Sequence, residues 1–190
     1  MSTEPLPKIK AATAVEVCAR FELEPEPRSL LRDTMSPREF LEALLAGKHP
    51  RAGIDFIAHA LPAREAVWWG CLCLQHATGG DLSALDKAAC RAAVQWIMQP
   101  TEEHRIAAQA PAQEVGLRTP AGQLAMAVNQ TGGNIAPPNA TPIPPAPYAS
   151  AKAVALAVIL ASTKVEPIRI VDTQRLFVEL GIGVAEGRFR

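Results

Sequence analysis

Hydrophobic residues recur every three or four positions over most of the first 130 residues, which places them on one face of a helix. The clearest case starts at Ser36, which is followed by Pro37 and then by Glu39. A serine and a glutamate at this spacing form a capping box, and proline is favoured in a first helical turn because the N–H it lacks would have no partner there. Phe40 opens the apolar face of this predicted helix, and Gly47 ends it.

The same pattern predicts further helices with recognisable starts and stops. Asp81 or Ser83 caps one of them, and Ser150 caps the helix that follows the proline-rich segment. Pro111 should break another helix near Ala110, because an internal proline removes a hydrogen bond and clashes with the preceding turn. The predicted ranges are 13–21, 25–31, 51–60, 62–77, 81–99, a broken helix after residue 101, 119–129, 151–163 and 173–180.

Short helices with short connections favour antiparallel neighbours, so the expected fold is all-α, a compact multi-helix bundle. Residues 66–74 are apolar on every side of their predicted helix, and we place that helix at the centre because a helix without a polar face is usually surrounded by protein. In the last helix, Arg175 and Glu179 are spaced to form an ion pair. The β-branched segment 165–171 leaves a short extended piece open as an alternative.

Prolines divide the chain into segments. Six of them fall between residues 136 and 147, a density that excludes helix and the interior of a sheet and predicts an extended strap. The expected organisation is a flexible N-terminal arm (1–12), a helical domain (13–131), the proline-rich strap (132–149) and C-terminal helices packed on the same core (150–190).

The segment from residue 119 to residue 163 carries a single formal charge, on Lys152, whereas surfaces of soluble domains are about a quarter to a third charged. One explanation is that the segment is mostly interior. The other is that part of it binds a partner, because contiguous exposed apolar area marks binding sites. The candidate interface residues are Pro137, Pro138, Pro144, Pro145, Tyr148, Val154 and Val158.

Three tryptophans are candidates for core or anchor positions: Trp68, Trp69 and Trp96. Neighbouring helix positions point about 100° apart, so Trp68 and Trp69 can both be buried only if their helix is packed on two sides. Core packing is the simpler explanation. The alternative is a partner anchor, because tryptophan is enriched at binding hot spots.

Composition narrows the function classes. Nineteen basic residues balance nineteen acidic ones, with no basic stripe of the kind that nucleic-acid binding requires. Glu4, Pro5 and Pro7 stand where a signal peptide would have its apolar run, so a cytoplasmic location is expected. The longest apolar run after Lys152 is far shorter than the ~20 residues that span a bilayer, so no membrane insertion is expected. The four cysteines lack C-x-x-C spacing and are predicted to be reduced, buried thiols.

Catalytic chemistry is not apparent in the sequence. The chain has no phosphate-binding glycine loop, no dinucleotide fingerprint, no H-E-x-x-H and no nucleophile elbow. Cys73 and His76, with His59 or Cys90 nearby in space, are the only candidate metal ligands, and zinc needs three or four that converge. We therefore predict a non-enzymatic protein without a cofactor or metal.

Several runs of sequence resemble a bacterial family. They are residues 37–45, residues 58–69, Thr119-Pro120-Ala121-Gly122, Gly132-Gly133 with Ala136-Pro137-Pro138, and residues 151–154. Together they span roughly residues 17 to 163. The chain resembles an uncharacterised bacterial family of small helical proteins encoded beside type VI secretion genes, near spike, effector and adaptor genes.

The resemblance implies an accessory, adaptor or chaperone-like factor whose partner is another protein, an effector or a spike component. It offers no catalytic residues to transfer and does not indicate an oligomeric state. The alternative is an immunity protein that neutralises a cognate toxin, and a third possibility is an enzyme with an unfamiliar helical site around His59, His76 or His104.

Overall fold

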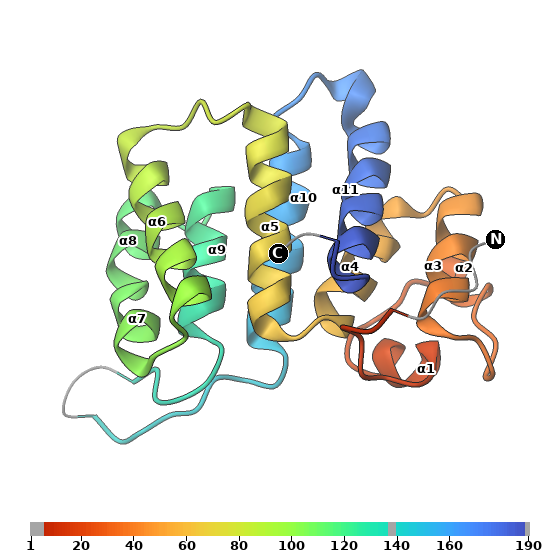
Figure 1. The fold of residues 1–190 in the computed structure, drawn as a ribbon, viewed down its shortest axis with the longest axis horizontal. Coiled ribbons are helices and arrows are strands. Elements are labelled where there is room, and N and C mark those ends of the chain that lie inside the picture. The colour runs from red at the N-terminus through yellow and green to blue at the C-terminus, as the bar shows by residue number, and fades with distance from the viewer. Residues whose placement is uncertain (1–5, 137–139, 189–190) are drawn as a thin grey trace.

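The computed structural model describes residues 6–136 and 140–188, and every regular element within these ranges is a helix (Figure 1). The all-α fold predicted from the sequence is confirmed. The helices are α1 (Ala14–Cys18), α2 (Pro25–Arg28), α3 (Pro37–Ala46), α4 (Pro50–Ala60), α5 (Ala63–Thr78), α6 (Ala84–Met98), α7 (Glu102–Ala107), α8 (Gln109–Val115), α9 (Pro120–Asn129), α10 (Ala149–Ser162), the short 3-10 helix η1 (Pro167–Arg169) and α11 (Ile170–Ala185).

Two helices, α5 and α10, lie side by side in the middle of the molecule (Figure 1). On one side of this pair, α6, α8 and α9 pack against one another, and α9 contacts both central helices. On the other side, α4 and α11 pack together, and α1 and α3 contact α4. The helices that follow the strap therefore share the core with those that precede it.

Side-chain capping accounts for the starts of five of the described helices, among them α3, α6 and α9. At α3, the Ser36 hydroxyl accepts from the Glu39 N–H, and the Glu39 carboxylate accepts from the Ser36 N–H, so the predicted capping box is confirmed. Thr119 caps α9 by accepting from the Gly122 N–H. Ser83, not Asp81, caps α6. The predicted break before Pro111 is found at Ala108, which separates α7 from α8.

The start of α10 differs from the prediction. Tyr148 precedes α10 as its N-cap, in a left-handed conformation with φ of 58°, so Ser150 lies inside the first turn and is not the cap. The segment that could have been extended, 165–171, instead contains η1 and the start of α11. The predicted ion pair in α11 is present, with 3.3 Å between Arg175 Nε and Glu179 Oε1.

The last helix runs on past Leu180, where the prediction ended it, because Gly181 serves close packing and not helix termination. A Cβ at Gly181 would lie 2.7 Å from Ile57 Cδ1 and 3.0 Å from Trp69 Nε1. The absence of a side chain lets α11 approach α4 and α5. Gly181 is buried inside the helix, and the loss of backbone entropy that glycine brings is offset by this contact.

Most of the charge-poor segment is interior. Nine of the ten residues of α9 are buried, and α10 buries seven of its fourteen. Val154 and Val158 are both 0% exposed, so their assignment to a partner surface is corrected: they pack within the core. Their helix is flanked by α4, α5, α9 and α11, which leaves little of it free.

The N-terminal segment also differs from the expected flexible arm. From Leu6 onward it is packed on the fold, with Leu6 and Ile9 buried and the Lys8 N–H donating to the Ala185 carbonyl. Residues 1–5 of the predicted arm lie outside the described residues. The buried positions in this short stretch are few and irregularly spaced, so the hydrophobic pattern of the sequence does not predict that the segment packs on the fold.

The adjacent tryptophans have different environments. Trp69 is fully buried and donates its indole N–H to the Phe177 carbonyl at 2.8 Å. Trp96 is buried as well, whereas Trp68 is only half-buried. Within the described ranges, none of the helices combines the length and apolar character needed to cross a membrane.

Candidate functional site

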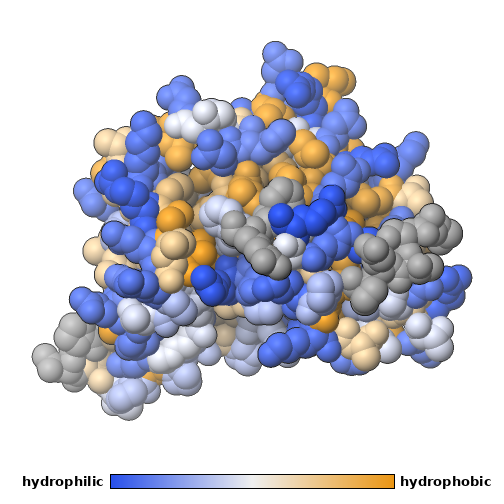
Figure 2. Space-filling view, in the orientation of Figure 1, coloured by the Kyte–Doolittle hydropathy of each residue, from blue (hydrophilic) through white to orange (hydrophobic). Residues whose placement is uncertain are grey.

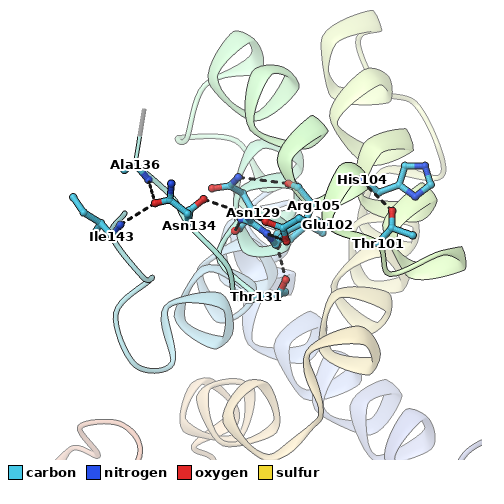
Figure 3. Close-up of polar contacts among 10 residues, drawn as sticks. Thr101, Glu102, His104, Arg105, Asn129, Thr131, Asn134, Ala136 and Ile143 are labelled. Atoms are coloured by element: carbon cyan, nitrogen blue, oxygen red, sulfur yellow. Dashed lines mark hydrogen bonds and ion pairs between the residues drawn. The ribbon is translucent and has the colours of Figure 1, made fainter. Parts of the chain in front are cut away.

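The strap is held against the helices by one buried arginine. Arg105, in α7, is 3% exposed and reaches the end of α9 and the start of the strap (Figure 3). Its guanidinium donates to the backbone carbonyls of Asn129 and Asn134. It also makes two hydrogen bonds of 2.7 Å to the carboxylate of Glu102, one turn earlier. This hydrogen bonding holds the pKa of the Glu102 carboxyl below its usual range.

Asn134 then folds the strap back on itself. Its side-chain oxygen accepts hydrogen bonds from the N–H groups of Ala136 and Ile143, at 2.9 and 2.8 Å (Figure 3). The Ile135 N–H donates to the Ile143 carbonyl. Gly133 has φ of +67°, and a Cβ there would lie 2.7 Å from Arg105 Nη2. The backbone at the start of the strap is therefore shaped to fit the guanidinium.

Beyond this anchor, the strap is exposed. Pro144 and Tyr148 are exposed, Pro145 is half-buried, and Pro137 and Pro138 lie outside the described residues. Ile143, which the sequence analysis did not single out, is 53% exposed. Ile143 is placed by the turn at Asn134, whose side chain accepts from the Ile143 N–H. The two residues are nine positions apart, so a helical or strand periodicity in the sequence does not predict this contact. Of the predicted interface, Pro144 and Tyr148 are thus exposed, and Ile143 adds exposed apolar surface between Asn134 and Tyr148.

A hollow of about 290 Å³, here called the α10 hollow, lies where the strap joins α10. The polar side chains that line it come from four parts of the chain. They are Arg20, His59, Gln130, Thr131, Tyr148 and Ser150. The packing of α10 on α4 and α9 brings these groups together. Sequence reasoning named His59 and Tyr148 separately and did not bring them into one site.

His59 is the most deeply buried polar group in this hollow. It is 4% exposed, and its ring stacks on Phe21 with 4.8 Å between centroids. Nδ1 lies 2.7 Å from the Asp55 carbonyl oxygen, while Nε2 is buried without a hydrogen-bond partner. Burial lowers the pKa of His59, and the nearby positive charges of Lys152 and Arg20 lower it further. The imidazole is therefore neutral near pH 7.

The carboxyl of Asp55, one turn before His59, is also buried, and this raises its pKa to about 6. Arg51 partly opposes the shift, and Glu24 adds to it. A raised folded-state pKa means that the folded protein binds the proton more tightly than the unfolded chain, so this carboxyl makes stability fall as pH rises from about 4 to about 6. We expect Asp55→Asn to remove that decline, which chemical denaturation at pH 4.5 and pH 7 would measure.

Asp33→Asn, the same change at an exposed aspartate, is the control variant for this experiment. The stability gain of Asp55→Asn should be largest at neutral pH and vanish towards pH 4. A gain that is equal at both pH values would contradict the burial of a charged carboxylate.

A second depression, here called the Trp68 groove, has a volume of about 600 Å³. Trp68, Ile97, Met98 and Val184 contribute apolar surface to it. The Trp68 indole N–H is buried without a partner, and Met98 is 70% exposed. Figure 2 shows hydrophobic patches on this face, over α6 and between α5 and α11, among hydrophilic residues. Trp68 thus suits the anchor alternative, whereas Trp69 and Trp96 are core.

The cysteine thiols have raised pKa values. Burial raises the pKa of Cys71 to about 12 and of Cys18 and Cys90 to about 11, and that of Cys73 well above its ordinary value. Thiols with such values are poor nucleophiles, because the thiolate is the reactive form. In the part of the chain that the structure describes, no group of three His, Cys, Asp or Glu side chains is placed to hold a metal ion.

Comparison with known protein families gives a match over most of the chain. The model of a family described as "Family of unknown function (DUF6931)" matches residues 40–185, which include α4 to α11, the strap and most of the α10 hollow. No curated protein and no solved structure matches the chain.

Proposed function

We propose that this chain, which belongs to the DUF6931 family, is a non-enzymatic helical protein that binds another protein through its strap. In this proposal it is a cytoplasmic adaptor or chaperone-like factor for a type VI secretion effector or spike component. The link to secretion comes from the resemblance of its sequence motifs to proteins encoded beside such genes. The binding role is supported by the structure of the strap.

One observation carries the proposal: an exposed, uncharged segment is fixed in place by a buried arginine. No Asp, Glu, Lys or Arg occurs between Arg118 and Lys152, and within that range Ile143 and Tyr148 are each about half exposed. An exposed surface without a binding partner would normally carry charged residues, because they favour solubility. A proline-rich segment held in one conformation loses little entropy when a partner binds, which favours recognition.

The cysteine environments support the non-enzymatic part of the proposal. Every cysteine pKa is raised by burial, the opposite of the shift that a catalytic nucleophile needs. A neutral, buried His59 beside Arg20 is suited to binding more than to proton transfer at pH 7, because its charged form is disfavoured.

The test is affinity purification of the tagged full chain from its native host, with Ile143→Glu as the strap variant. We expect the unmodified chain to recover an effector or spike component, and Ile143→Glu to reduce recovery by at least about tenfold, since a buried unpaired charge at an interface is costly. Ile168→Glu is the matched control, because Ile168 is 86% exposed on η1, away from the strap. Both variants should unfold at the temperature of the unmodified chain.

Two results would count against the proposal. The first is equal recovery of the secretion component by the strap variant and the control. The second comes from co-expression with a toxin encoded nearby. If the chain restores growth and Ile143→Glu does not, the strap neutralises a toxin, and the immunity function replaces the adaptor function.

A further inference from the structure

The α10 hollow brings together unpaired polar groups that the binding role of the strap does not use. α10 is fourteen residues long and has no side-chain cap, so its first-turn N–H groups at Ser150 and Ala151 face outward from an uncapped helix end. The Ser150 hydroxyl is buried without a partner, as is His59 Nε2. Leaving such groups unpaired costs free energy, and a ligand that pairs them would recover it.

The charges around the hollow favour an anion. Arg20 lines it and uses one of its N–H donors on the His59 carbonyl at 2.8 Å, which leaves other donors of the guanidinium for a ligand. The N-terminus of α10 adds partial positive charge. Among the described residues that line the hollow there is no Asp or Glu. Lys152, in the first turn of α10, is close enough to influence His59.

The protonation state of His59 restricts which hydrogen-bonding groups the anion can carry. Its Nδ1 faces a backbone carbonyl, which can only accept, so Nδ1 carries the proton and Nε2 presents a lone pair. Arg20 and Lys152 are the charged groups that bear on the imidazole, and both oppose its protonation. Asp55 contacts the ring through its backbone carbonyl. A ligand here must therefore combine negative oxygens with an O–H donor.

We propose that the α10 hollow binds a phosphate group, held by Arg20, Ser150 and the N-terminal N–H groups of α10, with a phosphate O–H donated to His59 Nε2. A hydrogen phosphate has both the oxygens and the hydroxyl, whereas sulfate and carboxylates lack the hydroxyl at neutral pH. Tyr148 also lines the hollow, and its half-exposed ring lies 6.1 Å from that of His59. The phosphate site does not depend on the strap binding a partner.

The full chain can be titrated with inorganic phosphate, O-phosphoserine and sulfate at about pH 6, where a phosphomonoester is partly protonated. Calorimetry should give a millimolar or tighter dissociation constant for a phosphate ligand, and at least roughly tenfold weaker binding of sulfate. The ¹⁵N resonance of His59 Nε2 should shift on binding, as expected for a lone pair that gains a donor. Stronger binding of O-phosphoserine assigns a phosphomonoester, and the reverse order assigns free phosphate; both orders support the site.

Ser150→Ala is the sharpest variant, because the hydroxyl has no partner in the free protein and its loss should leave the melting temperature unchanged. It should weaken phosphate binding severalfold, and Arg20→Gln should weaken it at least roughly tenfold. Arg91→Gln, an exposed change on α6, is the control and should have no effect. Absence of binding, equal affinity for sulfate and phosphate, or full affinity in both hollow variants would overturn the proposal.

Discussion

Trp69→Ala should destabilise the protein by about 4 kcal/mol, several times the effect of the same change at the neighbouring Trp68. Trp69 is fully buried, and its indole N–H donates to the Phe177 carbonyl, so the substitution removes a large apolar contact, a hydrogen bond and the filling of a closed space. Trp68 is half-buried and its N–H has no partner, so Trp68→Ala should cost only about 1–2 kcal/mol. Denaturant unfolding of the two variants measures the difference.

The contrast between adjacent residues is the control for this experiment. In a domain of this size, each kcal/mol moves the melting temperature by about 2–4 °C, so Trp69→Ala should melt roughly 10 °C or more below the unmodified chain. If Trp69→Ala is too unstable to purify, Trp69→Phe keeps most of the volume and isolates the lost hydrogen bond. Equal losses at the two positions would mean that α5 is packed on two sides, as the sequence alone allowed.

The different burial of Trp68 and Trp69 could not be predicted from the sequence. Their helix is apolar on every side, and periodicity cannot separate a face covered by another helix from one that borders an open groove. That distinction depends on Gly181, which lets α11 approach one side of α5, and on a chain separation of more than a hundred residues.

Features encoded by neighbouring residues were predicted well. The capping box at Ser36, the helix start at Thr119-Pro120 and the break before Pro111 each depend on contacts within one helical turn, where residue type largely decides the geometry. The start of α10 was not, because a tyrosine in the left-handed region is unfavourable locally and no residue type nearby indicates it.

The candidate site also combines features that the sequence predicts with features that depend on contacts between distant residues. Proline density predicts an extended strap, and composition identifies the segment as poor in charge. The sequence does not predict the anchoring role of Arg105, because an arginine in a short polar helix is usually exposed to solvent. Its carbonyl partners lie 24 and 29 residues further along the chain. His59 and Ser150 are brought to one hollow only by the packing of α10 on α4.

Arg105→Ala should detach the strap and destabilise the fold by about 2–4 kcal/mol, because the carbonyls of Asn129 and Asn134 lose their charged donor where water has little access. Hydrogen exchange can separate the two effects. The amides of Ile135 and Ile143 are protected by the turn that Asn134 makes. Once that turn is no longer held, the variant should increase their exchange rates, relative to the unmodified chain, at least roughly tenfold more than it increases those of amides in α5.

Arg175→Ala is the matched control, since it removes an arginine from an exposed i,i+4 pair with Glu179 and should change stability by less than about 0.5 kcal/mol. A second variant, Gly133→Ala, keeps Arg105 but places a Cβ 2.7 Å from its Nη2 at a backbone φ of +67°, and should loosen the same strap amides. Strap amides that stay protected in both variants would show that contacts other than Arg105 hold the segment, and the preorganised surface on which partner binding depends would then have a different origin.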